Sequence, residues 1–177
     1  MKWILSAALS LLSVSSFATT IPPMSFGTSF NFDEMKEEVQ AQPMFAKVDN
    51  EHIGAPIRLE VSHTFKGTAG GAAASFASIM WSSMSLGVLP IVTNKDLVIR
   101  YELRVNGKRL SYYEFSNNFT EAKNLYSEHN SFKLSGKPLE WVKSTVPEAT
   151  KKFEADPKVK ALLEEYQFYF GDVKKAE

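Results

Sequence analysis

The sequence predicts an α+β protein: a small antiparallel sheet with a central low-charge helix and C-terminal helices packed on it. Two observations predict the sheet. Apolar residues alternate with polar ones over residues 56–66 and again over 96–105, and an Asn-Gly pair follows the second run. The helices are predicted by apolar residues that recur at helical spacing in the last third of the chain, between prolines and a glycine.

The first residues have the three parts of a secretory signal peptide. Lys2 supplies a positive charge, the run from Trp3 to Val14 is apolar, and Ser16 and Ala18 are small residues at the −3 and −1 positions of a cleavage site. We therefore expect residues 1–18 to be removed by cleavage after Ala18. An uncleaved membrane anchor is the less favoured alternative, because the apolar run is shorter than the roughly 18 residues of a spanning helix.

The rest of the chain is expected to form a tether, one domain and a short tail. Residues 19–43 are expected to form a tether, because Pro22 and Pro23 interrupt regular structure, with a short acidic helix at Phe32–Gln42. Residues 44–171 are expected to form a single α+β domain, and residues 172–177 a tail. The chain contains no cysteine, which excludes disulfides, thiolate metal sites and lipid attachment to an N-terminal cysteine. Stability must therefore come from a packed core.

The strands are expected at about 56–66, 96–106 and 108–117. In the first, Ile57, Leu59 and Val61 begin a regular alternation that indicates one buried face. The other two form a hairpin, because Asn106-Gly107 supplies the two residues that tolerate positive φ in a type I′ turn. Such a turn predicts four opposed pairs: Val105 with Lys108, Arg104 with Arg109, Leu103 with Leu110, and Tyr101 with Tyr112.

An uncharged segment from Gly67 to Asn94 separates the first strand from the hairpin. Its middle, Gly71–Gly87, is predicted to be a helix that Gly87 and Pro90 end. Serines form one stripe of this helix, a candidate for close helix packing: Ser75, Ser78, Ser82 and Ser85. We expect the large apolar residues to be buried on the sheet: Phe76, Ile79, Met80 and Met84. Membrane insertion of residues 69–92 is the alternative, because the uncharged segment exceeds the roughly 20 residues that cross a bilayer.

Several start and stop residues predict the C-terminal helices. Pro138 opens one helix, Thr145 is expected to cap another that begins at Pro147, and Asp156-Pro157 starts the last, which Gly171 ends.

Composition and motifs point away from several functions. The formal net charge of zero gives no basic domain for nucleic acid. None of the three histidines has metal-ligand spacing, and no Gly-x-Ser-x-Gly elbow is present. We therefore expect no metal, no cofactor and no enzyme activity. A hydrolase whose triad joins His63 or His129 with a distant Ser and Asp stays open, since a triad is recognised by geometry.

The polar face of the hairpin carries the candidate interaction surface: Arg100, Glu102, Arg104, Arg109 and Tyr113. Arg104 opposite Arg109 should repel unless Glu102 or a bound anion compensates. Since arginine forks recognise carboxylates and phosphates, an acidic partner could dock there. An ordinary solvated sheet face is the alternative interpretation.

The arrangement resembles a group of small Gram-negative envelope proteins and lipoproteins. These have an export signal, a strand, a low-charge segment that ends in a Gly-Leu-Leu-Pro-like turn, and a strand hairpin. The corresponding residues here are Leu86–Pro90, followed by Leu97–Tyr113 with Asn106-Gly107. The chain departs from the group in lacking the lipidated cysteine. The resemblance implies an envelope location and no catalytic residue.

The sequence thus predicts an exported periplasmic protein with a non-enzymatic binding or envelope-assembly role through contacts with another envelope protein. A membrane-embedded envelope subunit and a hydrolase are the alternatives.

Overall fold

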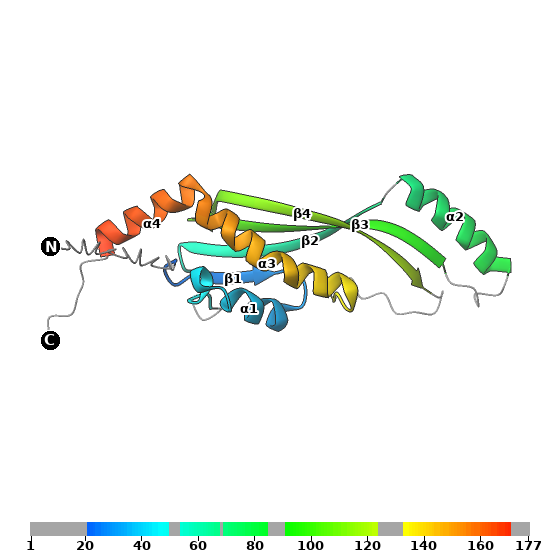
Figure 1. Cartoon of the computed structure of the whole chain (residues 1–177), viewed down its shortest axis with the longest axis horizontal. Helices are drawn as coiled ribbons and strands as arrows, with labels where there is room; N and C mark the ends of the chain where they lie inside the picture. Colours follow the sequence, from blue (N-terminus) through cyan, green and yellow to red (C-terminus); the bar gives the residue numbers. More distant parts are fainter. Residues whose placement is uncertain (1–20, 50–53, 68, 85–90, 124–132, 171–177) are drawn as a thin grey trace, which may run out of the picture.

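The computed structural model describes residues 21–49, 54–67, 69–84, 91–123 and 133–170 (Figure 1). The predicted signal peptide, the tail and Leu86–Pro90 lie outside these ranges. The elements in chain order are β1 (Ser25–Thr28), α1 (Phe32–Gln40), a 3-10 turn (Pro43–Phe45), β2 (Ile57–Gly67), α2 (Ala69–Met84), β3 (Ile91–Val105), β4 (Lys108–Lys123), α3 (Lys137–Ala155) and α4 (Pro157–Phe170).

The predicted α+β class is confirmed. The sheet has four strands in the order β1-β2-β3-β4. The three predicted strands are β2, β3 and β4, and they pair antiparallel. The fourth strand, β1, pairs parallel with β2, so the complete sheet is mixed.

The N-terminal part of the described chain belongs to the core. Ile21, Met24 and Phe26 are buried, and Phe26 pairs with Leu59 of the sheet. The short helix predicted in this region is present as α1, which buries Met35 and Val39 one turn apart. The tether interpretation is therefore wrong from residue 21 onwards. The apolar residues of the segment are spaced irregularly among prolines and a glycine, so no periodicity indicated their burial.

The hairpin register agrees with the prediction only beside the turn. Asn106 and Gly107 adopt positive φ (50° and 76°) as expected. The pairs Val105–Lys108 and Arg104–Arg109 are confirmed. Leu110 is then an extra residue in β4, so Leu103 pairs with Ser111 and Tyr101 with Tyr113. The predicted pairs of Leu103 with Leu110 and of Tyr101 with Tyr112 are wrong.

This bulge has a physical reason. Without it, Glu114 would lie opposite Ile99 on the apolar side of the sheet. With it, Phe115 lies opposite Ile99, and Glu114 faces the other side. One unpaired residue thus places the aromatic residues of β4 against the core.

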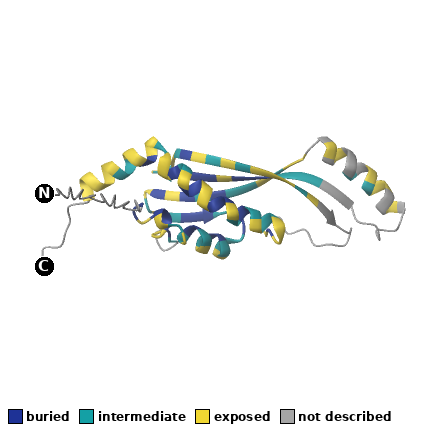
Figure 2. Cartoon of the chain, in the orientation of Figure 1, coloured by how far each residue is buried: buried dark blue, intermediate teal, exposed yellow. Residues whose placement is uncertain are grey.

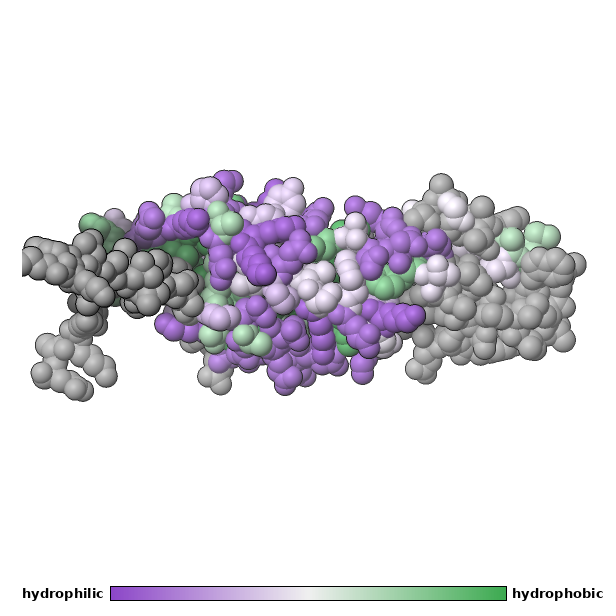
Figure 3. Space-filling model, in the orientation of Figure 1, coloured by the Kyte–Doolittle hydropathy of each residue, from purple (hydrophilic) through white to green (hydrophobic). Residues whose placement is uncertain are grey.

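Two helices cover one face of this sheet. The buried residues of α3 include Val142, Val146 and Phe153, and they join the same core as Ile99 and Tyr101. Pro147, expected to open a new helix, lies inside α3. The hydroxyl of Thr145 donates to the Val142 carbonyl (2.7 Å) instead of capping that helix. Burial is concentrated where α1 and α3 meet the sheet (Figure 2), and the visible surface over these helices is mainly hydrophilic (Figure 3).

The predicted low-charge helix is present as α2, but its position differs from the prediction. It lies at one end of the molecule, beside the start of β3 (Figure 1). Ile79 and Met80 are 47% and 55% exposed, so their predicted burial on the sheet is wrong. The face expected to receive them is occupied by α1 and α3. The side chains of Phe76 and Met84 lie outside the described part of the structure.

Candidate functional site

The sheet has a covered face and an open face. We call the side against α1 and α3, which carries Leu59, Ile99 and Tyr101, the covered face. The alternate residues of β2, β3 and β4 form the open face. Most of them are polar and exposed or half-exposed: Arg58, Glu60, Ser62, Thr64, Lys66, Asp96, Arg100, Arg104, Arg109, Tyr112 and Glu114.

Strand register sorts the open face into rows that run across the strands. Arg58 of β2 pairs with Arg104 of β3, which pairs with Arg109 of β4. The sequence predicted the pairing of Arg104 with Arg109. The pairing of Arg58 with Arg104 adds a third arginine, which was not predicted because the sequence gives no register for β2 against β3. The next rows are Glu60–Glu102–Tyr112 and Ser62–Arg100–Glu114.

The middle arginine of the first row is held by two carboxylates. Its Nε lies 2.6 Å from Glu102 Oε1 and 3.4 Å from Glu60 Oε2. The hydrogen bond to Glu102 and the charges of Glu102 and Glu60 raise the pKa of Arg104 above its ordinary value. Glu102 is only 7% exposed, and this ion pair satisfies its buried carboxylate. Glu102 therefore compensates the Arg104–Arg109 repulsion that the sequence raised.

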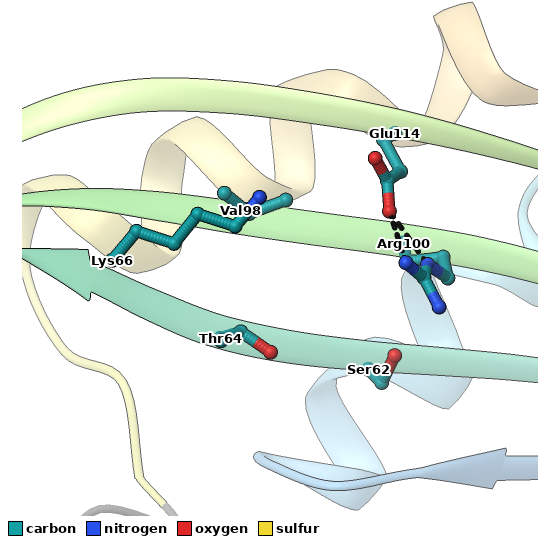
Figure 4. A pocket seen from close by; sticks show the side chains of 6 residues that line it. All are labelled: Ser62, Thr64, Lys66, Val98, Arg100 and Glu114. Carbon is teal, nitrogen blue, oxygen red and sulfur yellow. Dashed lines mark hydrogen bonds and ion pairs between the residues drawn. The ribbon is translucent and has the colours of Figure 1, made fainter.

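Arg100 is also paired. Its Nε and Nη2 lie 2.6 Å and 2.5 Å from Glu114 Oε1, and this hydrogen bond is the main reason that the pKa of Arg100 is raised. The two side chains border a shallow hollow of about 230 Å³, shown in Figure 4. Its other lining residues are Ser62, Thr64, Lys66 and Val98.

Tyr113 does not join this surface. Because of the bulge it lies on the covered face, where its ring meets Phe153 edge-on at 5.0 Å and its hydroxyl donates to Asp156 Oδ2 at 2.9 Å. Tyr112 takes its place and is 46% exposed. The guanidinium of Arg109 lies 4.6 Å from its ring centroid, and that of Arg100 lies 5.6 Å away. The sequence does contain a signal for this. Tyr113, Phe115 and Phe119 are separated by even numbers of residues, so they share one face of the strand, and that face differs from the one that Tyr112 occupies.

Asp156 is a second polar centre, at the junction of α3 and α4. Partial burial acts to raise the pKa of its carboxyl, but hydrogen bonds outweigh it and leave the pKa below its usual value. The donors are the hydroxyls of Ser111 and Tyr113 and the backbone N–H groups of Lys158 and Val159. As predicted, Asp156 precedes the last helix as its cap. Its hydrogen bonds from Ser111 and Tyr113 also connect that helix to β4, so we assign Asp156 a structural role.

The serine stripe is described only in part. Ser75 and Ser78 are half-exposed on α2, and the hydroxyl of Ser78 donates to the Ser75 carbonyl at 3.0 Å. Ser85 and the side chain of Ser82 lie outside the described residues. Close helix packing through this stripe stays a prediction.

One histidine meets a serine, which bears on the hydrolase alternative. Nδ1 of His63 lies 2.9 Å from Ser29 Oγ, and the backbone N–H of His63 donates to the same oxygen at 3.2 Å. The ring of His63 also contacts Phe30 and Phe65 edge-on. Because Ser29 follows the last residue of β1, its hydroxyl stands in for the next acceptor of the β1–β2 ladder. We therefore assign Ser29 a structural role. His129 lies outside the described residues.

Within the described ranges, no three His, Asp or Glu side chains are grouped so that they could hold a metal ion. The same part of the chain has no helix with the length and apolar character needed to cross a membrane. The geometry therefore defines the class: an α+β protein with one sheet face covered and the other open. No protein-family model and no curated protein sequence matches the chain.

Proposed function

We propose that this is a non-enzymatic binding or assembly protein of the cell envelope, and that its open sheet face contacts another envelope protein. The observation that supports this most is Tyr112, exposed between the guanidiniums of Arg100 and Arg109. Tyrosine and arginine are the residues that most often dominate the energy of protein interfaces. Here neighbouring side chains already orient them, which lowers the entropy lost on binding.

The experiment for the open face is photo-crosslinking in living cells. A photoreactive residue replaces Tyr112 in the full chain, and a matched chain carries it at Lys151, which is exposed on α3. We expect adducts of one defined mass from position 112 and none of that mass from position 151. Equal adduct patterns from both positions, or no adduct from position 112, would refute the proposed surface.

The envelope location rests on the pattern of residues 1–18. Fractionating cells and sequencing the N-terminus of the purified protein tests location and cleavage together. We expect a periplasmic or membrane-peripheral protein that begins at Thr19. A cytosolic protein that keeps residues 1–18 would contradict this part of the proposal.

Exposure of Ile79 and Met80 supports a second candidate, membrane association through residues 69–92. These side chains project from a 16-residue helix without a charged residue. Such a helix is about 24 Å long, less than the roughly 30 Å of a bilayer core, so α2 by itself would bind at a membrane surface. Washing membranes with carbonate or high salt, with Ile79→Lys as the comparison, tests this. Recovery of both proteins in the soluble fraction without any wash would exclude it.

A further inference from the structure

Gly27 makes room for the side chain of Arg58. The two residues lie on neighbouring strands, and a Cβ added at Gly27 would collide with Nη2 of Arg58 and stand 3.2 Å from its Cζ and Nε. Gly27 is itself buried, although it lies on the open side of β1. The guanidinium of Arg58 is thus seated on bare backbone, which orients it without a carboxylate.

Arg109, at the other end of the same row, is oriented by a ring. Its guanidinium lies 4.6 Å from the centroid of Tyr112, within the range of a cation–π contact. Between described residues, neither Arg58 nor Arg109 forms an ion pair, whereas Arg100 and Arg104 both do. In this row the guanidiniums of Arg58 and Arg109 are oriented but form no ion pair with a described residue, and Arg104 between them is neutralised by carboxylates.

We propose that Arg58 and Arg109 each bind a carboxylate of an acidic segment of the partner protein, and that Gly27 positions Arg58 for this contact. The inference rests on the proposed function and names the chemistry of its partner. Since neighbouring strands are about 4.8 Å apart, the two arginine backbones are separated by about 10 Å. A segment in the polyproline II conformation advances about 9 Å in three residues and, with three residues per turn, brings the third side chain back to the same side. The matching pattern is therefore an acidic residue followed by another three positions later.

The carboxylates of the adjacent row limit where the segment can lie. Glu60 and Glu102 would repel an acidic chain, but both are within reach of Arg104, which compensates part of their charge. The segment must therefore cross the strands along the arginine row, on the side of the row nearer the hairpin turn and away from Glu60 and Glu102. Guanidiniums favour this recognition because they donate two parallel hydrogen bonds to one carboxylate.

The test uses the purified full chain and a fluorescent peptide with two glutamates three positions apart, with binding measured by anisotropy. Arg58→Gln and Arg109→Gln should each weaken binding about tenfold, since each removes the charge-assisted hydrogen bonds to one carboxylate. Gly27→Ala should weaken it about threefold to tenfold by displacing the guanidinium of Arg58. Thermal unfolding of this variant should be unchanged, because only the end of a flexible side chain must move.

Lys66→Gln is the matched control. It removes the same unit charge from the same face, eight residues along β2 from Arg58, and should change binding less than twofold at physiological salt. The inference is overturned if Lys66→Gln weakens binding as much as Arg58→Gln, if the wild-type chain does not bind the peptide, or if inorganic phosphate at equal concentration competes as well as unlabelled peptide. Any of these results would overturn the acidic-segment inference without affecting the crosslinking test at position 112. Absence of the crosslink at position 112 would instead refute the open face as a binding surface.

Discussion

Along β3, Leu97, Ile99 and Leu103 have no exposed surface on the covered face, whereas Arg100 on the open face is exposed and Arg104 half-exposed. The two sets come from one strand and alternate residue by residue. The covered set lies in one core with the aromatic and aliphatic side chains of α1 and α3. The open set contacts its own cross-strand neighbours and solvent.

This difference separates stability from binding. Burial of an apolar side chain contributes about 1.5–3 kcal/mol, whereas an exposed ion pair contributes about 0–1 kcal/mol. Substitutions on the covered face should therefore change the free energy of unfolding strongly. Substitutions on the open face should leave folding nearly unchanged and affect only what binds there. Four predictions test this contrast, from the largest effect to the smallest.

Phe153→Ala should lower the free energy of unfolding by about 3–5 kcal/mol. The ring has no exposed surface and contacts both Phe45 and Tyr113 edge-on, so its removal leaves a cavity. Urea unfolding measures this. Phe168→Ala is the control, because Phe168 is 79% exposed and its loss should change stability by about 0.5 kcal/mol or less. Equal losses for the two variants would show that α3 does not form the core.

Tyr101→Phe and Tyr112→Phe compare the same chemical change on the two faces. The hydroxyl of Tyr101 is buried 2.9 Å from Thr145 Oγ1, and burial raises its pKa far above the ordinary value. Its loss should lower the free energy of unfolding by about 1–2 kcal/mol, because Thr145 loses a buried partner. Tyr112→Phe should change stability by less than about 0.5 kcal/mol. A larger effect at Tyr112 would mean that the open face contributes to folding.

Asp156→Asn should lower the free energy of unfolding by about 1 kcal/mol at neutral pH, since it weakens the cap of α4 and its bonds to β4. The pKa of Asp156 is lowered in the folded protein. Its carboxylate therefore stabilises the fold above the unfolded pKa of about 3.9, and this contribution is lost as the pH falls through the folded pKa. Chemical unfolding at a series of pH values should show the difference from wild type shrinking below about pH 4. A difference independent of pH would contradict the assignment.

The exposed pair Arg100–Glu114 should contribute least. A double-mutant cycle of Arg100→Ala and Glu114→Ala should give a coupling free energy below about 1 kcal/mol, because both side chains are exposed to solvent. Added salt should reduce it further by screening. A coupling well above 2 kcal/mol would place this pair among the structural contacts and weaken the separation of the two faces.

Local patterns predicted most of the elements because they depend on neighbouring residues. The alternation in Ile57–Val61 predicts a strand wherever it lies, and Asn106-Gly107 predicts a tight turn whatever follows. The helix starts at Pro138 and Asp156 are likewise local, and the structure contains both α3 and α4. The errors concern contacts with residues distant in sequence. Phe26 is buried only because β2 lies beside it, and no local pattern marks that pairing.

The same distinction holds for the candidate site. The Arg104–Arg109 pairing followed from turn geometry, and the structure confirms it. The presence of Tyr112 instead of Tyr113 on the open face did not follow from turn geometry, because the bulge at Leu110 is favoured by the core that receives Phe115. The contribution of Arg58 depends on Gly27, a residue 31 positions earlier that only the parallel β1–β2 register brings beside it.

By itself, therefore, the sequence determined the α+β class, the strands β2 to β4, the turn and the position of most helix starts. These depend on backbone preferences and on periodicities that extend over a few residues. Only the tertiary structure decided which face of each strand is covered, where α2 lies, and which arginines form no ion pair with another described residue. Those properties depend on long-range packing, because a side chain is buried or left free according to what the rest of the chain places against it.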